Sequence, residues 1–136
     1  MGPKLITLDT SALYALVNRR DPDHESVREA FEQDGGPYLV PAGILAEIAY
    51  LLEQRLGNDV LDAFLGDLEN GALTFEAGEE DLARVRELIA RYADLPLGFA
   101  DAAVIACAER SGGRVLTLDS RDFGTVAREG TITLLP

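Results

Sequence analysis

LITLDTS, residues 5–11, is the stretch that decides the fold: a short apolar run ends on Asp9, and two small hydroxyl residues follow. Near the other end the same design recurs as RVLTLDS, residues 114–120, ending on Asp119 and a serine. Short apolar runs bounded by polar residues predict buried strands. An aspartate directly after each strand would lie at the carboxyl end of a sheet, where α/β proteins place their functional sites.

Strand and helix patterns alternate along the rest of the chain. Apolar runs predict strands over residues 4–9, 38–40, 73–75, 114–118 and 131–135. Helical spacing predicts helices over residues 11–19, 21–33, 43–56, 58–69, 79–93 and 99–111, with a loop through residues 122–124. Because the clearest strands are apolar throughout, we expect an α/β fold with three layers, α/β/α, around a mainly parallel sheet of four to five strands. The length suits a single domain spanning residues 1–136.

Several local details are also predicted. Thr10 or Ser11 would cap the first helix, and Asp21-Pro22 would open the second. In helix 79–93 the apolar residues would face inward and the charges would be solvated, with inward positions Leu82, Val85, Leu88, Ile89 and Tyr92. Helices 43–56 and 58–69 hold more apolar residues than one small core can bury, which indicates a surface for a partner chain.

Composition excludes several classes of protein. The net charge of −12 argues against a protein that coats nucleic acid by bulk electrostatics, but an enzyme with a local basic rim stays possible. The sequence has neither a membrane-spanning apolar stretch nor the layout of a signal peptide, so we expect a cytoplasmic protein without membrane association. The single Cys107 lies in an apolar run and reads as an inert buried thiol, and His24 reads as an exposed bystander.

Two further acids, Glu47 and Asp101, interrupt apolar helical stretches. With Asp9 and Asp119 they make four carboxylates that could meet at one rim of the sheet. A carboxylate in apolar surroundings is costly unless a positive charge meets it, and clustered carboxylates take up a proton unless a cation intervenes. Oxygen ligands without His or Cys favour Mg²⁺ or Mn²⁺ over zinc. We therefore expect all four acids to converge on a divalent metal.

Such a site suits phosphoryl chemistry. One or two Mg²⁺ ions can hold a phosphate, activate a water and stabilise the leaving oxygen. Asp9 would be the central ligand, Asp101 and Asp119 would complete the metal sphere, and Glu47 would hold metal or orient the water. Thr10, Ser11 or Thr117 could donate hydrogen bonds to the carboxylates or to a scissile phosphate.

Four motifs in this order resemble the PIN-domain ribonucleases, and most closely the VapC toxins of type II toxin–antitoxin modules; they are residues 8–13, 46–47, 96–102 and 117–124. The resemblance implies that Asp9, Glu47, Asp101 and Asp119 form the catalytic and metal-binding quartet, with hydroxyls at Ser11 and Thr117 and a further candidate acid at Asp122. It also implies an endoribonuclease, dependent on Mg²⁺ or Mn²⁺, that hydrolyses RNA phosphodiester bonds with a metal-activated water. A homodimer and a VapB-type antitoxin whose tail blocks the site are implied as well.

Other interpretations stay open. Each acid alone could be a helix cap, a turn residue or a surface charge, and the chain could be a catalytically weak PIN-like binding protein that acts through a protein partner. A receiver domain would need a lysine after a late strand, but Lys4 is the only lysine. A phosphatase of the haloacid-dehalogenase type would need an acid where Ser11 stands. Which arginines contact RNA phosphates is left open by the sequence, and the candidates are Arg19, Arg20, Arg55, Arg84, Arg86, Arg91 and Arg121.

Overall fold

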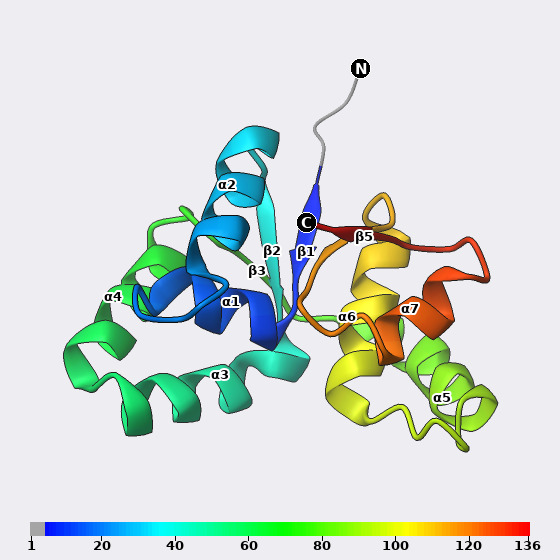
Figure 1. Cartoon of the computed structure of the whole chain (residues 1–136). Coiled ribbons are helices and arrows are strands. Elements are labelled where there is room, and N and C mark those ends of the chain that lie inside the picture. Colours follow the sequence, from blue (N-terminus) through cyan, green and yellow to red (C-terminus); the bar gives the residue numbers. More distant parts are fainter. Residues whose placement is uncertain (1–4) are drawn as a thin grey trace.

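The computed structural model describes residues 5–136 and contains one five-stranded sheet in the order β3-β2-β1-β4-β5 (Figure 1). All four neighbouring pairs are parallel, which confirms the predicted sheet type. The strands are β1 Ile6–Leu8, β2 Tyr38–Pro41, β3 Thr74–Glu76, β4 Arg114–Leu116 and β5 Thr133–Leu135. Strands β1 and β4, the two that the opening motifs predicted, therefore lie side by side at the centre.

Helices cover both faces of this sheet. The helices are α1 Thr10–Val17, α2 His24–Asp34, α3 Ala42–Arg55, α4 Asn58–Glu69, α5 Leu82–Arg91, α6 Phe99–Arg110 and α7 Asp122–Ala127, with a 3₁₀ turn, η1, at Glu79–Asp81. Figure 1 shows α1, α2 and α4 on one side of the strands and α5, α6 and α7 on the other. Helix α3 follows the end of β2 and packs against both α1 and α6. The arrangement is the expected α/β/α sandwich.

The core is built around β1 and α6. Ile6 and Leu8 of the central strand are fully buried, and so are Val104 and Ile105 of α6. All three residues of β1 are buried, because helices cover both faces of the sheet, so burial does not alternate along this strand. Cys107 is buried in the same helix and accepts a weak hydrogen bond from Thr7, so the thiol is part of the core as expected.

Gly43 fixes how closely α3 approaches α6. A Cβ atom added at Gly43 would lie only 2.4 Å from the Cβ of Ala103, so a larger residue would push the two helices apart. Glu47 and Asp101 belong to these same two helices. The glycine therefore helps to set the spacing between two of the predicted site residues.

Some predicted details were wrong. Helix α1 begins at Thr10 with Asp9 as its N-cap residue, so neither Thr10 nor Ser11 is the cap, and α2 begins at His24 rather than at Asp21-Pro22. Asp21 instead accepts a hydrogen bond from the backbone of Asp23 and closes the turn before the helix. His24 is only partly exposed, because its Nδ1 lies 2.8 Å from the carbonyl oxygen of Ala15.

Two larger corrections concern the second half of the chain. The segment predicted as a loop through residues 122–124 forms helix α7, whose Phe123 and Val126 are buried. In the predicted helix 79–93 the first turn is 3₁₀, and Leu82 and Ile89, both expected inside, are 58% and 37% exposed. Residue 4, the predicted start of the first strand, lies outside the described residues. Among residues 5–136, none of the helices is long and apolar enough to cross a membrane.

Candidate active site

The predicted acids gather at the carboxyl edge of the sheet because of where the strands end. Asp9 follows β1 directly, and Asp119 follows the neighbouring β4 after two residues. Asp101 lies in the first turn of α6, where the helix dipole favours an anion. Glu47 lies one turn further into α3, with its side chain exposed.

Asp9 is held in place by two hydroxyl groups. Ser11 Oγ and Thr117 Oγ1 each donate a hydrogen bond of 2.8 Å to the same carboxylate oxygen, Oδ2. Ser11 Oγ in turn accepts the backbone N–H of Leu118 at 3.0 Å, which ties α1 to the segment after β4. Asp9 is only 5% exposed, and this burial raises the pKa of its carboxyl, while the two hydroxyl groups oppose the rise. The result is a fixed carboxylate whose Oδ1 neither hydroxyl uses.

Three other carboxylates lie close together beside it. Asp101, Asp119 and Asp122 each offer an oxygen, and these three atoms lie within 4.8 Å of one another. Thr117 Oγ1 accepts the N–H of Asp119 at 3.0 Å, and Asp119 Oδ1 accepts the N–H groups of Arg121 and Asp122 at 3.2 Å each. The turn that starts α7 therefore carries Asp122 into the group.

The acids act on one another electrostatically. The pKa of Asp101 is raised to about 6, first by burial and then by the negative charges of Asp9, Asp119, Asp122 and Glu47. Within residues 5–136, no arginine forms an ion pair with any of these five acids. A group of carboxylates that repel one another and lack a cationic side chain is the environment that suits a hard divalent cation.

Sequence reasoning ranked two residues differently from their positions in the structure. Asp122 was only a further candidate acid but belongs to the compact group, whereas Glu47 lies outside that group and acts on Asp101 by charge. Asp122 follows Asp119 by only three residues, and this proximity in the sequence was the available signal. Thr10, which was a possible donor to the carboxylates, has a buried hydroxyl that makes no hydrogen bond within the described residues.

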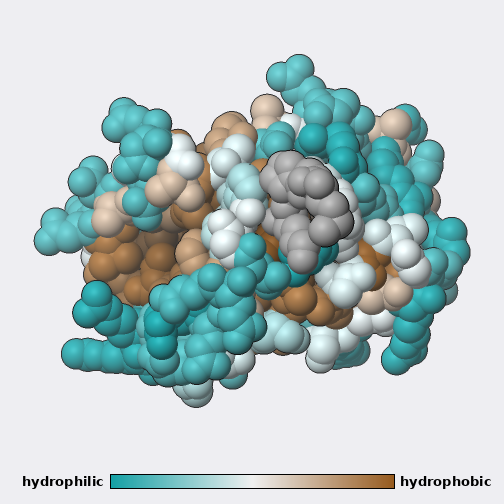
Figure 2. Space-filling model, turned by 90° about the horizontal axis from the view of Figure 1, so that it is seen from above, coloured by the Kyte–Doolittle hydropathy of each residue, from teal (hydrophilic) through white to brown (hydrophobic). Residues whose placement is uncertain are grey.

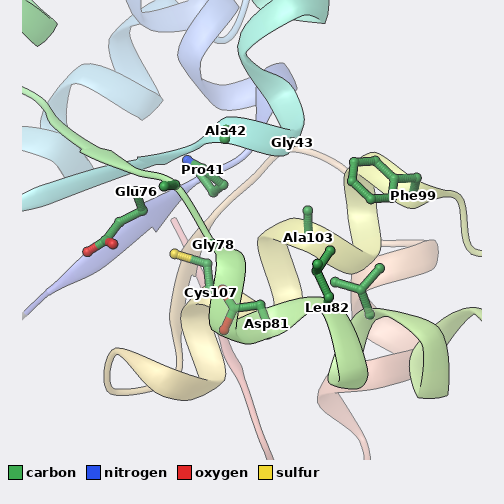
Figure 3. A pocket seen from close by; sticks show the side chains of 12 residues that line it. Pro41, Ala42, Gly43, Glu76, Gly78, Asp81, Leu82, Phe99, Ala103 and Cys107 are labelled. Atoms are coloured by element: carbon green, nitrogen blue, oxygen red, sulfur yellow. The ribbon is translucent and has the colours of Figure 1, made fainter.

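A separate apolar pocket lies beyond α6. Figure 3 shows it between the start of α3 and the segment that leads into α5, with Phe99 and Ala103 of α6 on its wall. None of the five acids of the cluster lines it. Leu82 and Phe99 leave large apolar surfaces exposed at this side of the molecule.

Comparison with known proteins identifies the family. A model of the PIN domain matches residues 6–129 of this chain. Ribonuclease VapC26 of Mycobacterium tuberculosis is 33% identical over 133 residues, which are 95% of this chain and 98% of that protein. The chain belongs to the PIN-domain family. Its acid cluster occupies the carboxyl edge of the PIN sheet, and the resemblance read from the four sequence motifs is confirmed.

Two solved structures share the architecture of this PIN domain. The crystal structure of VapC20 of M. tuberculosis, a sarcin–ricin-loop-cleaving toxin, matches with a TM-score of 0.77 and 24% identity over 89% of this chain and 94% of that one. The VapBC2 complex of Rickettsia felis bound to a DNA fragment from its promoter matches with a TM-score of 0.69 and 16% identity, over 96% of both chains. At these identities the two matches establish the fold.

Proposed function

We propose that this PIN domain is a metal-dependent endoribonuclease and the toxin of a VapBC-type toxin–antitoxin module, acting in the cytoplasm. The observation that carries the proposal is the cluster of acids around Asp101, whose pKa is raised to about 6 and which no arginine of the described residues neutralises. The 33% identity to a VapC ribonuclease along nearly the whole chain supports RNA as the substrate.

The metal would be Mg²⁺ or Mn²⁺, because every candidate ligand is a carboxylate oxygen. Asp101, Asp119 and Asp122 fit one cation by their mutual proximity, and Asp9 would join them through Oδ1. Glu47 would contribute from the exposed side. A bound cation would neutralise the carboxylates, polarise a phosphoryl oxygen and lower the pKa of a water molecule.

The remaining roles belong to the chain itself. Thr117 and Ser11 orient Asp9, and Thr117 also fixes the backbone at Asp119. Their hydroxyl groups therefore hold the ligands rather than attack the substrate. Glu47 has an exposed carboxylate one turn inside α3 and could accept a proton from the water that attacks phosphorus.

A VapB-type antitoxin is the proposed partner. Helices α1 and α4 form a shallow groove with an apolar floor and charged borders, lined by Leu16, Val17, Val60, Ala63 and Phe64 and by Arg19, Asp59 and Asp67. Figure 2 shows a hollowed apolar area with hydrophilic borders in the half of the molecule that holds α1, α2 and α4. Apolar residues of helix 58–69 that the core does not fully bury line this groove, and an amphipathic segment of the antitoxin would bind there.

We also propose that the toxin forms a homodimer. Tyr50, Leu82 and Phe99 are 63%, 58% and 56% exposed, and these large apolar side chains would be covered if two chains pack together. Light scattering after gel filtration tests this directly, and a monomer at high protein concentration would refute it.

RNA cleavage by the purified protein tests the function. Cleavage is expected with Mg²⁺ or Mn²⁺, none is expected in chelator, and Asp101→Asn should be inactive while the exposed Asp62→Asn on α4 cleaves normally. Intact RNA under all metal conditions, together with tight binding of the VapB-type antitoxin, would favour the weakly catalytic binding protein instead.

For the antitoxin groove, Val60→Glu should prevent co-purification of the antitoxin and leave cleavage by the isolated toxin unchanged.

A further inference from the structure

Helix α7 has a cationic outer face. Its buried side packs Phe123 and Val126 into the core. Arg121, immediately before the helix, and Arg128, immediately after it, are both exposed. Arg121 and Arg128 flank this six-residue helix with helical backbone angles and are seven residues apart, almost two full turns, so the two side chains share one face of α7, about 10 Å apart along its axis. Thr125 lies between them on that face.

These two arginines are unpaired, unlike many others. Among the described residues, Arg28, Arg84, Arg91, Arg110 and Arg114 form ion pairs with acids. Neither Arg121 nor Arg128 does. For Arg121 this is notable, because its neighbours in sequence include Asp119 and Asp122.

Local hydrogen bonds fix the backbone of Arg121. Asp119 turns its Oδ1 back onto the N–H groups of Arg121 and Asp122, and both carboxylates belong to the group around Asp101. The carbonyl oxygen of Arg121 accepts the hydroxyl of Thr125 at 3.0 Å. The backbone of Arg121 is thus fixed at the rim of the acid cluster, while its guanidinium is exposed.

We propose that Arg121 and Arg128 form an RNA-backbone-binding strip along α7, which leads from the acid cluster and holds phosphates next to the scissile one. The inference rests on the proposed ribonuclease function. An RNA strand that approaches a protein of net charge −12 needs local cations, and guanidinium groups bind phosphate oxygens in a two-pronged manner. The metal serves the scissile phosphate, and the strip serves the flanking ones. Because the strip binds these phosphates equally in the ground and transition states, it sets KM rather than kcat.

The test compares Arg121→Gln and Arg128→Gln with Arg20→Gln, an exposed and unpaired arginine in the α1–α2 turn on the opposite side of the molecule (Figure 1). The probe is a fluorescein-labelled single-stranded RNA of mixed sequence, cleaved in Mn²⁺. Arg121→Gln should raise KM about tenfold, the effect expected for removing one charge-assisted hydrogen bond, with kcat changed less than about twofold. The slope of log(kcat/KM) against log salt should become shallower by about 0.7 for each phosphate that the variant no longer binds.

Three readouts separate this role from a structural one. The thermal unfolding midpoint should be unchanged in both variants, and Arg121→Lys should recover part of the affinity because it keeps the charge. Fluorescence anisotropy with the same RNA, measured for each variant in the inactive Asp101→Asn background, should show the same ranking of variants. Variants that bind this RNA with wild-type affinity and wild-type salt dependence would overturn the strip. A wild-type protein that binds the RNA through these arginines but never cleaves it would instead overturn the proposed catalysis.

Discussion

Thr117→Val probes the support of the metal ligands most directly, because one hydroxyl serves two of them. Thr117 Oγ1 donates to Asp9 Oδ2 at 2.8 Å and accepts the N–H of Asp119 at 3.0 Å. Valine has nearly the same shape, so the change removes both hydrogen bonds without opening a cavity. Thr117 is buried, which means that water cannot easily replace the missing hydroxyl.

The expected effect follows from these two bonds. A hydrogen bond to a charged group contributes about 1.5–3 kcal/mol, and supporting residues behind metal ligands typically change metal affinity or activity by about 10–100-fold. Ser11 still donates to Asp9, so we expect the lower part of this range, about tenfold weaker Mn²⁺ binding and a similar decrease in kcat/KM. The pKa of Asp9 should also rise further, because a hydrogen bond that lowers it is gone.

Isothermal titration with Mn²⁺ and RNA cleavage at saturating Mn²⁺ measure the two effects separately. Thr74→Val, at an exposed position of β3, is the matched control and should change neither quantity. Thr117→Ser should behave like the wild type, since it restores the hydroxyl. A Thr117→Val protein with wild-type Mn²⁺ affinity and wild-type cleavage would refute the view that this hydroxyl aligns the ligands.

Three other perturbations give defined outcomes. Folding raises the pKa of Asp101 from 3.8 to about 6, so the metal-free protein should lose stability as pH rises from about 4 through 6. In thermal unfolding, either Asp101→Asn or added Mn²⁺ should reduce this loss of stability. Gly43→Ala should lower the free energy of unfolding by about 1–3 kcal/mol, because the added methyl group clashes with α6. Gly66→Ala in α4 meets no neighbour and should raise the free energy of unfolding by about 0.5–1 kcal/mol. Equal effects of the two variants in denaturant unfolding would contradict the close α3–α6 crossing. Arg110→Ala should cost about 2–3 kcal/mol because it leaves the buried Asp81 without its two-pronged partner, and a change below about 0.5 kcal/mol in the same measurement would contradict that reasoning.

The sequence predicted the sheet and most helices because their signals are local. The runs ending at Asp9 and Asp119 are apolar enough to be read as buried strands, and helix 58–69 was predicted with the boundaries it has in the structure. Helix α7 was missed because it is short and contains Gly124, and its only signal is the three-residue spacing of Phe123 and Val126. A six-residue helix of this kind is stabilised by packing rather than by intrinsic propensity.

The site was predictable in outline but not in detail. The rule that functional residues follow parallel strands predicts that Asp9 and Asp119 lie at the same edge of the sheet. The pairing of Ser11 and Thr117 on one oxygen of Asp9 depends on the tertiary placement of α1 beside the segment after β4, which no local pattern encodes. Asp122 lies beside Asp101 and Asp119 because it begins helix α7, which the sequence did not predict.

The distribution of arginines ties stability to function in this small acidic protein. Away from the site, several arginines that the sequence suggested were solvated neutralise acids across elements: Arg84 binds Glu109 of α6, and Arg91 binds Glu129 after α7. At the site, the described arginines leave the carboxylates around Asp101 unpaired, although Arg121 is adjacent to them in sequence. An ion pair between Arg121 and these carboxylates would relieve their repulsion in the metal-free protein. It would also occupy the carboxylate oxygens that would bind a metal and the guanidinium that would bind a phosphate. The repulsion among the carboxylates therefore lowers the stability of the metal-free protein, but it leaves the carboxylate oxygens and the Arg121 guanidinium free to bind metal and phosphate.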